Sequence, residues 1–317
     1  MASQLPVSPL APKKFPKLPT IEGISLATYA TGSRYKGRDD LLLVRFAAGT
    51  SVAGVFTTSK APSASVDLSR SNLASSKGRA GALVVNAGIA NAFTGKAGAK
   101  AAQTTAAAAA KAFRCAANQI FIASTGVIGA DLDPTPLVAA IDELAADMPI
   151  TGGDYGAAAK AIMTTDTFAK AATRVVKFGK EQVRINAIVK GSGMIAPDMA
   201  TLLAFVFTDA AIPPSVLQKL LNESNAKSLN SITVDSDTST SDTCLMFASG
   251  HKALGGAPLR SIEDKRLRAF RAGLQDIMQD IAVQTVSDGE GVSKIMTIDV
   301  TGAENDAAAR RIGLAIG

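Results

Sequence analysis

Short apolar runs separated by polar, glycine-marked turns fill most of the chain, and this pattern predicts many strands. Residues 24–29 and 41–46 are the first two, with turn residues around Gly32 and Gly37 between them. Residues 171–176 and 182–189 read as a hairpin around Gly179. The other predicted strands are 52–58, 82–86, 119–123, 202–207 and 295–300.

Longer segments with helical periodicity lie between these strands. Residues 99–117 are rich in alanine, which costs least in a helix interior. Residues 213–228 place four apolar side chains on one face, as in an amphipathic helix. Strands and helices mixed in this way predict an α+β fold. The other predicted helices are 134–148, 155–163, 260–285 and 304–316.

Composition narrows the class of protein. The 317 residues suffice for one large or two ordinary domains, and the core must rest on Ala, Val, Leu and Ile because aromatics make up only 5%. A formal charge of +6 fits an anionic substrate and weak nucleic-acid contact equally well. However, no basic run is interleaved with aromatics and no zinc-type spacing occurs, so we expect no nucleic-acid role.

Three sequence features predict a cytoplasmic protein. Cys115 and Cys244 lie far apart, which suggests a reducing compartment and not a disulfide scaffold. Residues 1–20 have lysines and prolines but no signal-type apolar core, so we expect an extended arm. No stretch reaches the roughly 18 apolar residues of a membrane span.

His251 is the only histidine and lies in a loop-like stretch, which favours a surface position. Metal sites built on histidine pairs are therefore excluded, and a Ser-His-Asp triad would depend on this one residue. We expect the chemistry to use threonine, lysine, carboxylates and backbone amides. No metal or organic cofactor is predicted.

Residues 190–204 connect two apolar runs through an irregular loop. Gly191 and Gly193 permit backbone angles closed to other residues, and Pro197 restricts the chain further. Such a loop would hold Thr201 in a defined pose. A threonine hydroxyl becomes an effective nucleophile when its own α-amine is free, which requires cleavage of the preceding peptide bond. The spacing fits this chemistry and also fits a plain glycine-rich connection.

The sequence of residues 190–201, Lys-Gly-Ser-Gly-Met-Ile-Ala-Pro-Asp-Met-Ala-Thr, resembles the self-cleavage segment of the ornithine acetyltransferase family, the bifunctional glutamate N-acetyltransferases. The resemblance implies cleavage between Ala200 and Thr201 and extends over residues 21–317. The family usually has Asn in place of Asp198. A second loop departs from the family pattern at Ala87, Ile89 and Phe93.

The resemblance also assigns a site. Thr125 and Gly126 follow a predicted strand, where the residues alone fit a strand-to-turn junction or an oxyanion hole. The family implies the oxyanion hole. It also implies that Lys190, Thr167 and Glu290 hold the amino-acid part of the substrate, with Thr165 less suited than Thr167. An Asp- and hydroxyl-rich run at 230–243 lacks EF-hand spacing, and the resemblance implies a structural loop near the active centre.

The implied reaction is ping-pong acetyl transfer from N-acetylornithine to glutamate through an acetyl ester on Thr201. Some family members also use acetyl-CoA, and no stretch here decides that point. The implied fold is a layered αββα sandwich like the ornithine acetyltransferase and DmpA-like fold. Residues 21–200 would form an α chain and residues 201–317 a β chain, assembled as a higher homo-oligomer of αβ units. Family members continue with a further C-terminal segment that supplies substrate contacts.

Two alternatives stay open. One is an aminopeptidase or amidase with an N-terminal nucleophile, although such enzymes usually carry serine at the new N-terminus. The other is an uncleaved, inactive homologue. Asp198, the altered loop at Asn86 and the expected lack of the C-terminal segment keep this second alternative open.

Overall fold

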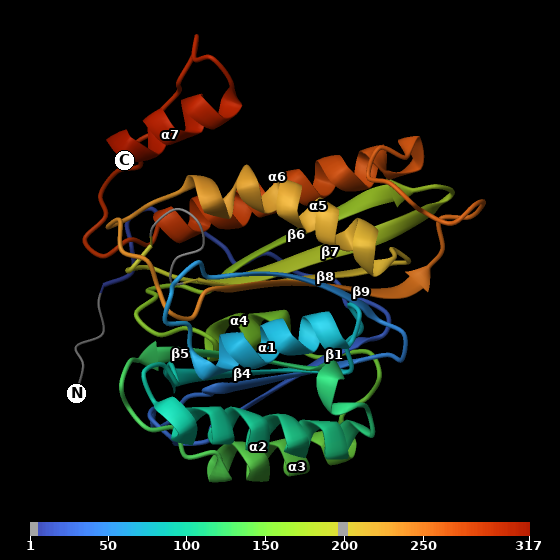
Figure 1. Ribbon diagram of the computed structural model, residues 1–317, viewed down its shortest axis with the longest axis vertical. Helices are drawn as coiled ribbons and strands as arrows, with labels where there is room; N and C mark the ends of the chain where they lie inside the picture. The colour runs from blue at the N-terminus through green and yellow to red at the C-terminus, as the bar shows by residue number, and fades with distance from the viewer. Residues whose placement is uncertain (1–5, 196–201) are drawn as a thin grey trace.

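Two β-sheets lie face to face between outer layers of helices in the computed structural model, which describes residues 6–195 and 202–317 (Figure 1). The four-stranded sheet has the order β1-β2-β4-β5, with strands Ile24–Tyr29, Leu41–Phe46, Ala82–Ile89 and Ile120–Val127. The five-stranded sheet has the order β3-β9-β8-β7-β6, with strands Ser51–Phe56, Thr243–Lys252, Leu203–Ala210, Glu181–Lys190 and Lys170–Phe178.

Helices cover both outer faces of this pair of sheets. The four-stranded sheet is covered by α2 (Gly95–Phe113) and α3 (Thr135–Asp147), and the five-stranded sheet by α5 (Pro214–Ala226) and α6 (Arg268–Val286) (Figure 1). The result is the expected αββα sandwich. The remaining helices are α1 (Ala64–Ser75) and α4 (Tyr155–Ala161) between the sheets, α7 (Asp306–Ile316) apart from them, and short 3-10 turns at Ala117–Gln119, Leu229–Ser231 and Lys265–Leu267.

The central core is formed by side chains that alternate along each strand. On β5, Phe121 belongs to the cluster between the sheets, whereas Ile122 belongs to the cluster under α2 and α3. Phe247 of β9 stacks on Phe46 of β2 with ring centroids 4.2 Å apart, so aromatic contacts join the two sheets directly. Both faces of each sheet are thus buried, which explains the continuous apolar runs in the sequence.

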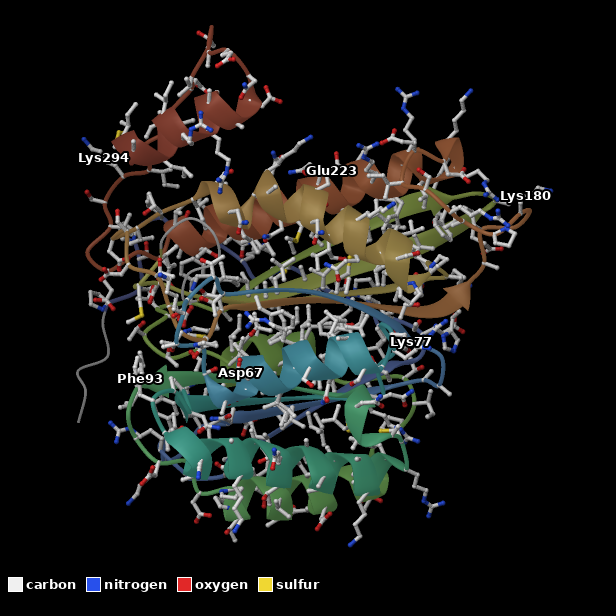
Figure 2. The ribbon with its side chains drawn as sticks, viewed as in Figure 1. Asp67, Lys77, Phe93, Lys180, Glu223 and Lys294 are labelled. Carbon is white, nitrogen blue, oxygen red and sulfur yellow. The ribbon has the colours of Figure 1, made fainter. Side chains whose placement is uncertain are left out.

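One end of the sandwich gathers strand ends from both sheets. Strands β4 and β5 run parallel and end together, with Gly88 paired to Gly126. In the other sheet, Lys190 at the end of β7 pairs with Leu203 at the start of β8, and Leu203 pairs with Thr243 at the start of β9. The segments expected to carry the chemistry therefore meet at this end. Figure 2 labels Phe93 at the same end and Lys180 at the opposite one.

Several sequence predictions need correction. Residues 295–300 form no strand, and His251 lies in β9 and not in a loop, although its side chain is exposed as expected. The helix predicted for 260–285 begins only at Arg268, after a 3-10 turn. Helix α2 begins at Gly95, four residues earlier than predicted. Among the described residues, no helix is long and apolar enough to cross a membrane.

Candidate active site

A buried hydrogen bond joins the two sheets at the shared end. Lys190, the last residue of β7, donates from Nζ to Oγ1 of Thr125 on β5 over 2.9 Å. Both side chains are buried, and the two residues are 65 positions apart in the chain. The fold thus places the predicted substrate lysine next to the predicted oxyanion threonine.

Gly126 follows Thr125 at the exposed end of β5, and its backbone requires glycine. Its φ is +128°, and a Cβ at this position would lie 2.2 Å from the carbonyl carbon of Gly88. Strands β4 and β5 can end together at this spacing only because Gly126 has no side chain. The sequence Thr-Gly therefore combines a buried hydroxyl with an exposed backbone that the substrate can approach.

Charged groups around Lys190 are mostly paired. Burial lowers the pKa of the Lys190 ammonium, and the neighbouring Asp166 carboxylate partly opposes that shift. Burial alone would raise the pKa of Asp166, but Lys170 and Lys190, together with hydrogen bonds, hold it at about 2. Asp166 also accepts the backbone N–H of Gly191 over 2.7 Å, so it fixes the start of the loop that follows Lys190.

Thr165 and Thr167, which precede β6, contact different parts of the structure. Oγ of Thr165 lies 2.6 Å from Oγ of Ser192, against the loop after Lys190. Thr167 instead donates its hydroxyl to Asp288, accepts the N–H of Ser8 over 2.9 Å, and donates its own N–H to Asp288 over 2.9 Å. The structure therefore brings Thr165 to the loop and Thr167 to the end of α6 and the N-terminal arm.

The proposed nucleophile itself lies outside the described residues, as do Ala200 and Asp198. The residues on either side of residues 196–201 are held firmly. Asp235 accepts the backbone N–H groups of Met194 and Ile195, the second over 2.7 Å. Asp242 accepts the N–H of Leu202 over 2.8 Å. The Asp- and hydroxyl-rich loop is thus a hydrogen-bonded support beside the site, as expected.

Glu290 lies close to the same loop. It is exposed, and its Oε1 lies 3.0 Å from where a Cβ on Gly193 would be. Gly193 therefore leaves room for this carboxylate over the loop. Within residues 6–195 and 202–317, no group of three or more His, Cys, Asp or Glu side chains is arranged to hold a metal ion.

Two features of the site were not anticipated from the sequence. Asp242 is completely buried, burial raises the pKa of its carboxyl well above the usual range, and Oδ2 has no partner among the described residues. The turn before β2, which contains Arg34 and Tyr35, packs directly on Gly88. Buried Asp residues in polar loops and turns that fold back on a sheet leave no periodic signal in sequence.

Several known proteins resemble this chain over most of its length. The model of the ArgJ family matches residues 25–317. The chain is 54% identical to the arginine biosynthesis bifunctional protein ArgJ of Rhizobium meliloti over 98% of this chain and 74% of that protein. Against the protein of the same name in Agrobacterium fabrum the identity is 52%, with the same coverage of both chains. A crystal structure of the Bacillus halodurans protein matches with 33% identity and a TM-score of 0.51, over 57% of this chain and 92% of that chain.

Proposed function

The chain belongs to the ArgJ family, the acetyltransferases of arginine biosynthesis, and on that premise we propose how its residues carry out the reaction. N-acetylornithine donates its acetyl group to Thr201, and glutamate then accepts that group. The products are ornithine and N-acetylglutamate. The enzyme alternates between a free and an acetylated threonine.

Self-cleavage prepares the nucleophile. The hydroxyl of Thr201 attacks the carbonyl carbon of Ala200, the peptide C–N bond breaks, and an ester forms while the nitrogen leaves as the α-amine. Water then hydrolyses the ester, which frees the Thr201 hydroxyl and leaves residues 1–200 and 201–317 as two covalently separate chains. The clamps at Ile195 and Leu202 support this step, because fixing both ends of a short segment raises the share of reactive conformations.

Acetyl transfer follows the same chemistry with the substrate amide. The Thr201 hydroxyl attacks the acetyl carbonyl, its proton passes to the freed α-amine, and the tetrahedral oxyanion is stabilised by the Thr125 hydroxyl and the Gly126 N–H. The amine then protonates the departing ornithine nitrogen. In the second half, the glutamate nitrogen attacks the acetyl ester and restores Thr201.

Lys190, Thr167 and Glu290 are the proposed substrate contacts. The Lys190 ammonium suits the α-carboxylate, and the exposed Glu290 carboxylate suits an amine. Thr167 donates one hydrogen bond and accepts one, which leaves one lone pair of its hydroxyl for a substrate donor. Whether acetyl-CoA also donates acetyl groups is decided by assay.

The Lys190–Thr125 hydrogen bond carries the proposal. It joins Lys190, the proposed carboxylate-binding group, to Thr125, the proposed oxyanion-stabilising group. Both lie near Ile195 and Leu202, whose backbone N–H groups are held on either side of the cleavage segment.

The solved relative supports a two-chain enzyme. Its match spans about 180 residues, 57% of 317, yet this is 92% of that chain. That polypeptide is therefore about half as long as the Rhizobium meliloti protein, of which 311 matched residues are 74%. We further propose that the two chains stay together in a homo-oligomer of αβ units, in the cytoplasm. Both described cysteines are free, as a reducing compartment would favour.

Intact mass of the purified protein tests the proposal, with Thr201→Ala as the control. We expect two fragments that meet at Ala200 and Thr201, absent in the control. Acetyl transfer is then measured with and without glutamate. Release of acetate that is independent of glutamate would favour the aminopeptidase or amidase alternative, and an uncleaved protein without activity would favour the inactive homologue.

A further inference from the structure

The turn between β1 and β2 lies directly against the oxyanion pair. A Cβ on Gly88 would be 2.6 Å from Cβ of Arg34 and 3.2 Å from Cε2 of Tyr35. Gly88 in turn touches Gly126, whose added Cβ would meet the Gly88 backbone. Arg34 is therefore separated from the oxyanion glycine by the backbone of one residue.

The same turn is anchored on the substrate side of the site. Arg38 donates from Nη2 to the carbonyl of Met163 over 2.5 Å, and its guanidinium lies 4.2 Å from the Tyr35 ring centroid. Burial raises the pKa of the half-buried Tyr35 phenol, and the neighbouring positive charges of Arg38 and Arg34 partly oppose that shift. The turn thus spans from the end of β4 to the run that contains Thr165 and Thr167.

Arg34 presents an uncompensated positive charge at this place. Its side chain is exposed, and no carboxylate of the described residues lies within 4.0 Å of its guanidinium. The two acids of the turn are engaged elsewhere: Asp39 accepts the Thr28 hydroxyl over 2.5 Å and Asp40 accepts the Thr31 N–H over 2.7 Å. By contrast, Lys170 is already paired with two carboxylates.

We propose that Arg34 binds the side-chain carboxylate of the acceptor glutamate and so selects the acceptor. The inference rests on the proposed function. Donor and acceptor both carry an α-carboxylate and an α-nitrogen, but ornithine ends in an ammonium and glutamate in a carboxylate. A guanidinium forms paired hydrogen bonds with a carboxylate and repels an ammonium. Arg34 therefore serves the second half of the reaction and not the first.

Two assays separate these halves. Exchange of labelled ornithine into N-acetylornithine needs no glutamate and reports the donor half, while acetyl transfer to glutamate reports the acceptor half. In Arg34→Gln we expect the KM for glutamate to rise about tenfold, the size typical of a partly exposed charge-assisted contact, with exchange within twofold of the wild type. Preference for glutamate over glutamine as acceptor should fall by a similar factor.

Lys36→Gln is the matched control, because Lys36 is an exposed cation in the same turn that makes no hydrogen bond or ion pair among the described residues. It should leave both assays unchanged. Arg34→Lys keeps the charge without the planar fork and should give an intermediate KM for glutamate. An unchanged glutamate KM in Arg34→Gln, or an equal loss of exchange and transfer, would overturn the proposal.

Calorimetric titration with glutamate measures binding without acetyl transfer. It therefore tests the Arg34 site separately from the proposed function. Wild-type protein that binds glutamate through Arg34 but transfers no acetyl group would disprove the proposed function and retain the Arg34 site. Wild-type protein that transfers acetyl groups to glutamate, with identical glutamate titrations in the wild type and Arg34→Gln, would disprove the Arg34 site alone. Wild-type protein that neither binds nor acetylates glutamate would disprove both.

Discussion

At the scale of single residues, the site depends on positions where a side chain is impossible. Gly126 has a left-handed backbone and touches the Gly88 backbone, so neither the strand pairing nor the proposed oxyanion pair tolerates a Cβ there. Gly129, three residues later, also has a positive φ, of +80°, but has no described atom within 4 Å of an added Cβ. Both glycines have a positive φ, but only Gly126 has close neighbours. Comparing alanine substitutions at the two positions therefore distinguishes the cost of steric contact from the cost of backbone strain.

Gly126→Ala is therefore expected to lower the free energy of unfolding by more than about 4 kcal/mol, because backbone atoms of two strands would have to move. Gly129→Ala should cost only about 1 kcal/mol, the price of a left-handed non-glycine residue. Urea unfolding of both variants measures the difference. Similar stability losses in the two variants would show that the left-handed backbone, and not the contact with Gly88, determines the cost of the substitution.

The sequence could indicate the types of catalytic residue but not their partners. The family resemblance, and not the residues alone, pointed to Thr125, Gly126, Lys190 and Glu290 as site residues. The fold brings the first three to one end of the sandwich. The link between Lys190 and Thr125 is a contact between two sheets, so no local pattern encodes it. Arg34 gave no signal, because an arginine in a glycine-flanked turn looks like any solvated surface residue.

At the scale of elements, helices and strands with apolar periodicity were predictable, and a polar helix was not. Helix α1 buries Ser65, Ser69 and Asn72, which bind β5: for example, the Ser69 hydroxyl donates to the carbonyl of Ile122 over 2.7 Å. A helix that packs through small polar groups lacks the apolar stripe on which pattern analysis depends. Conversely, residues 295–300 have a strand-like pattern but pair with no strand in the part of the chain that the structure describes.

The loop at 230–243 acts as one element that clamps the cleavage segment from both sides. Asp235→Ala removes the acceptor of two backbone N–H groups before residue 196, so the segment should spend less time in the reactive geometry. We expect self-cleavage to slow by about tenfold or more, a loss of at least about 1.4 kcal/mol. Intact mass followed over time after synthesis of the precursor provides the measurement.

Asp237→Ala is the control for this loop, because Asp237 is exposed and its carboxylate accepts no hydrogen bond among the described residues. It should cleave at the wild-type rate. If Asp235→Ala and Asp237→Ala cleaved equally fast, the clamp would have no part in positioning the segment.

At the scale of the whole molecule, one buried cation ties distant parts of the chain together. Lys170, at the start of β6, donates to Asp166 over 2.6 Å and to Asp288, beyond the end of α6, over 2.5 Å. All three side chains are fully buried. Asp288 also holds Thr167, which binds the N-terminal arm through Ser8. The active-site end thus depends on an ion network that spans 280 residues of sequence, from Ser8 to Asp288.

Lys170→Met should therefore destabilise the protein by about 3–5 kcal/mol at pH 7, because two buried carboxylates would lose their common partner. The loss should shrink in acid. The pKa of Asp166 is about 2, below its unfolded value of about 3.9, so its stabilisation is present above pH 5 and disappears as pH falls through 2. Urea unfolding at pH 7 and pH 3 measures both effects.

Lys180→Met is the control, because Lys180 lies at the exposed tip of the β6–β7 hairpin (Figure 2). It should change stability at neither pH. A Lys170→Met variant as stable as the wild type at pH 7 would mean that the two carboxylates share a proton and need no cation between them.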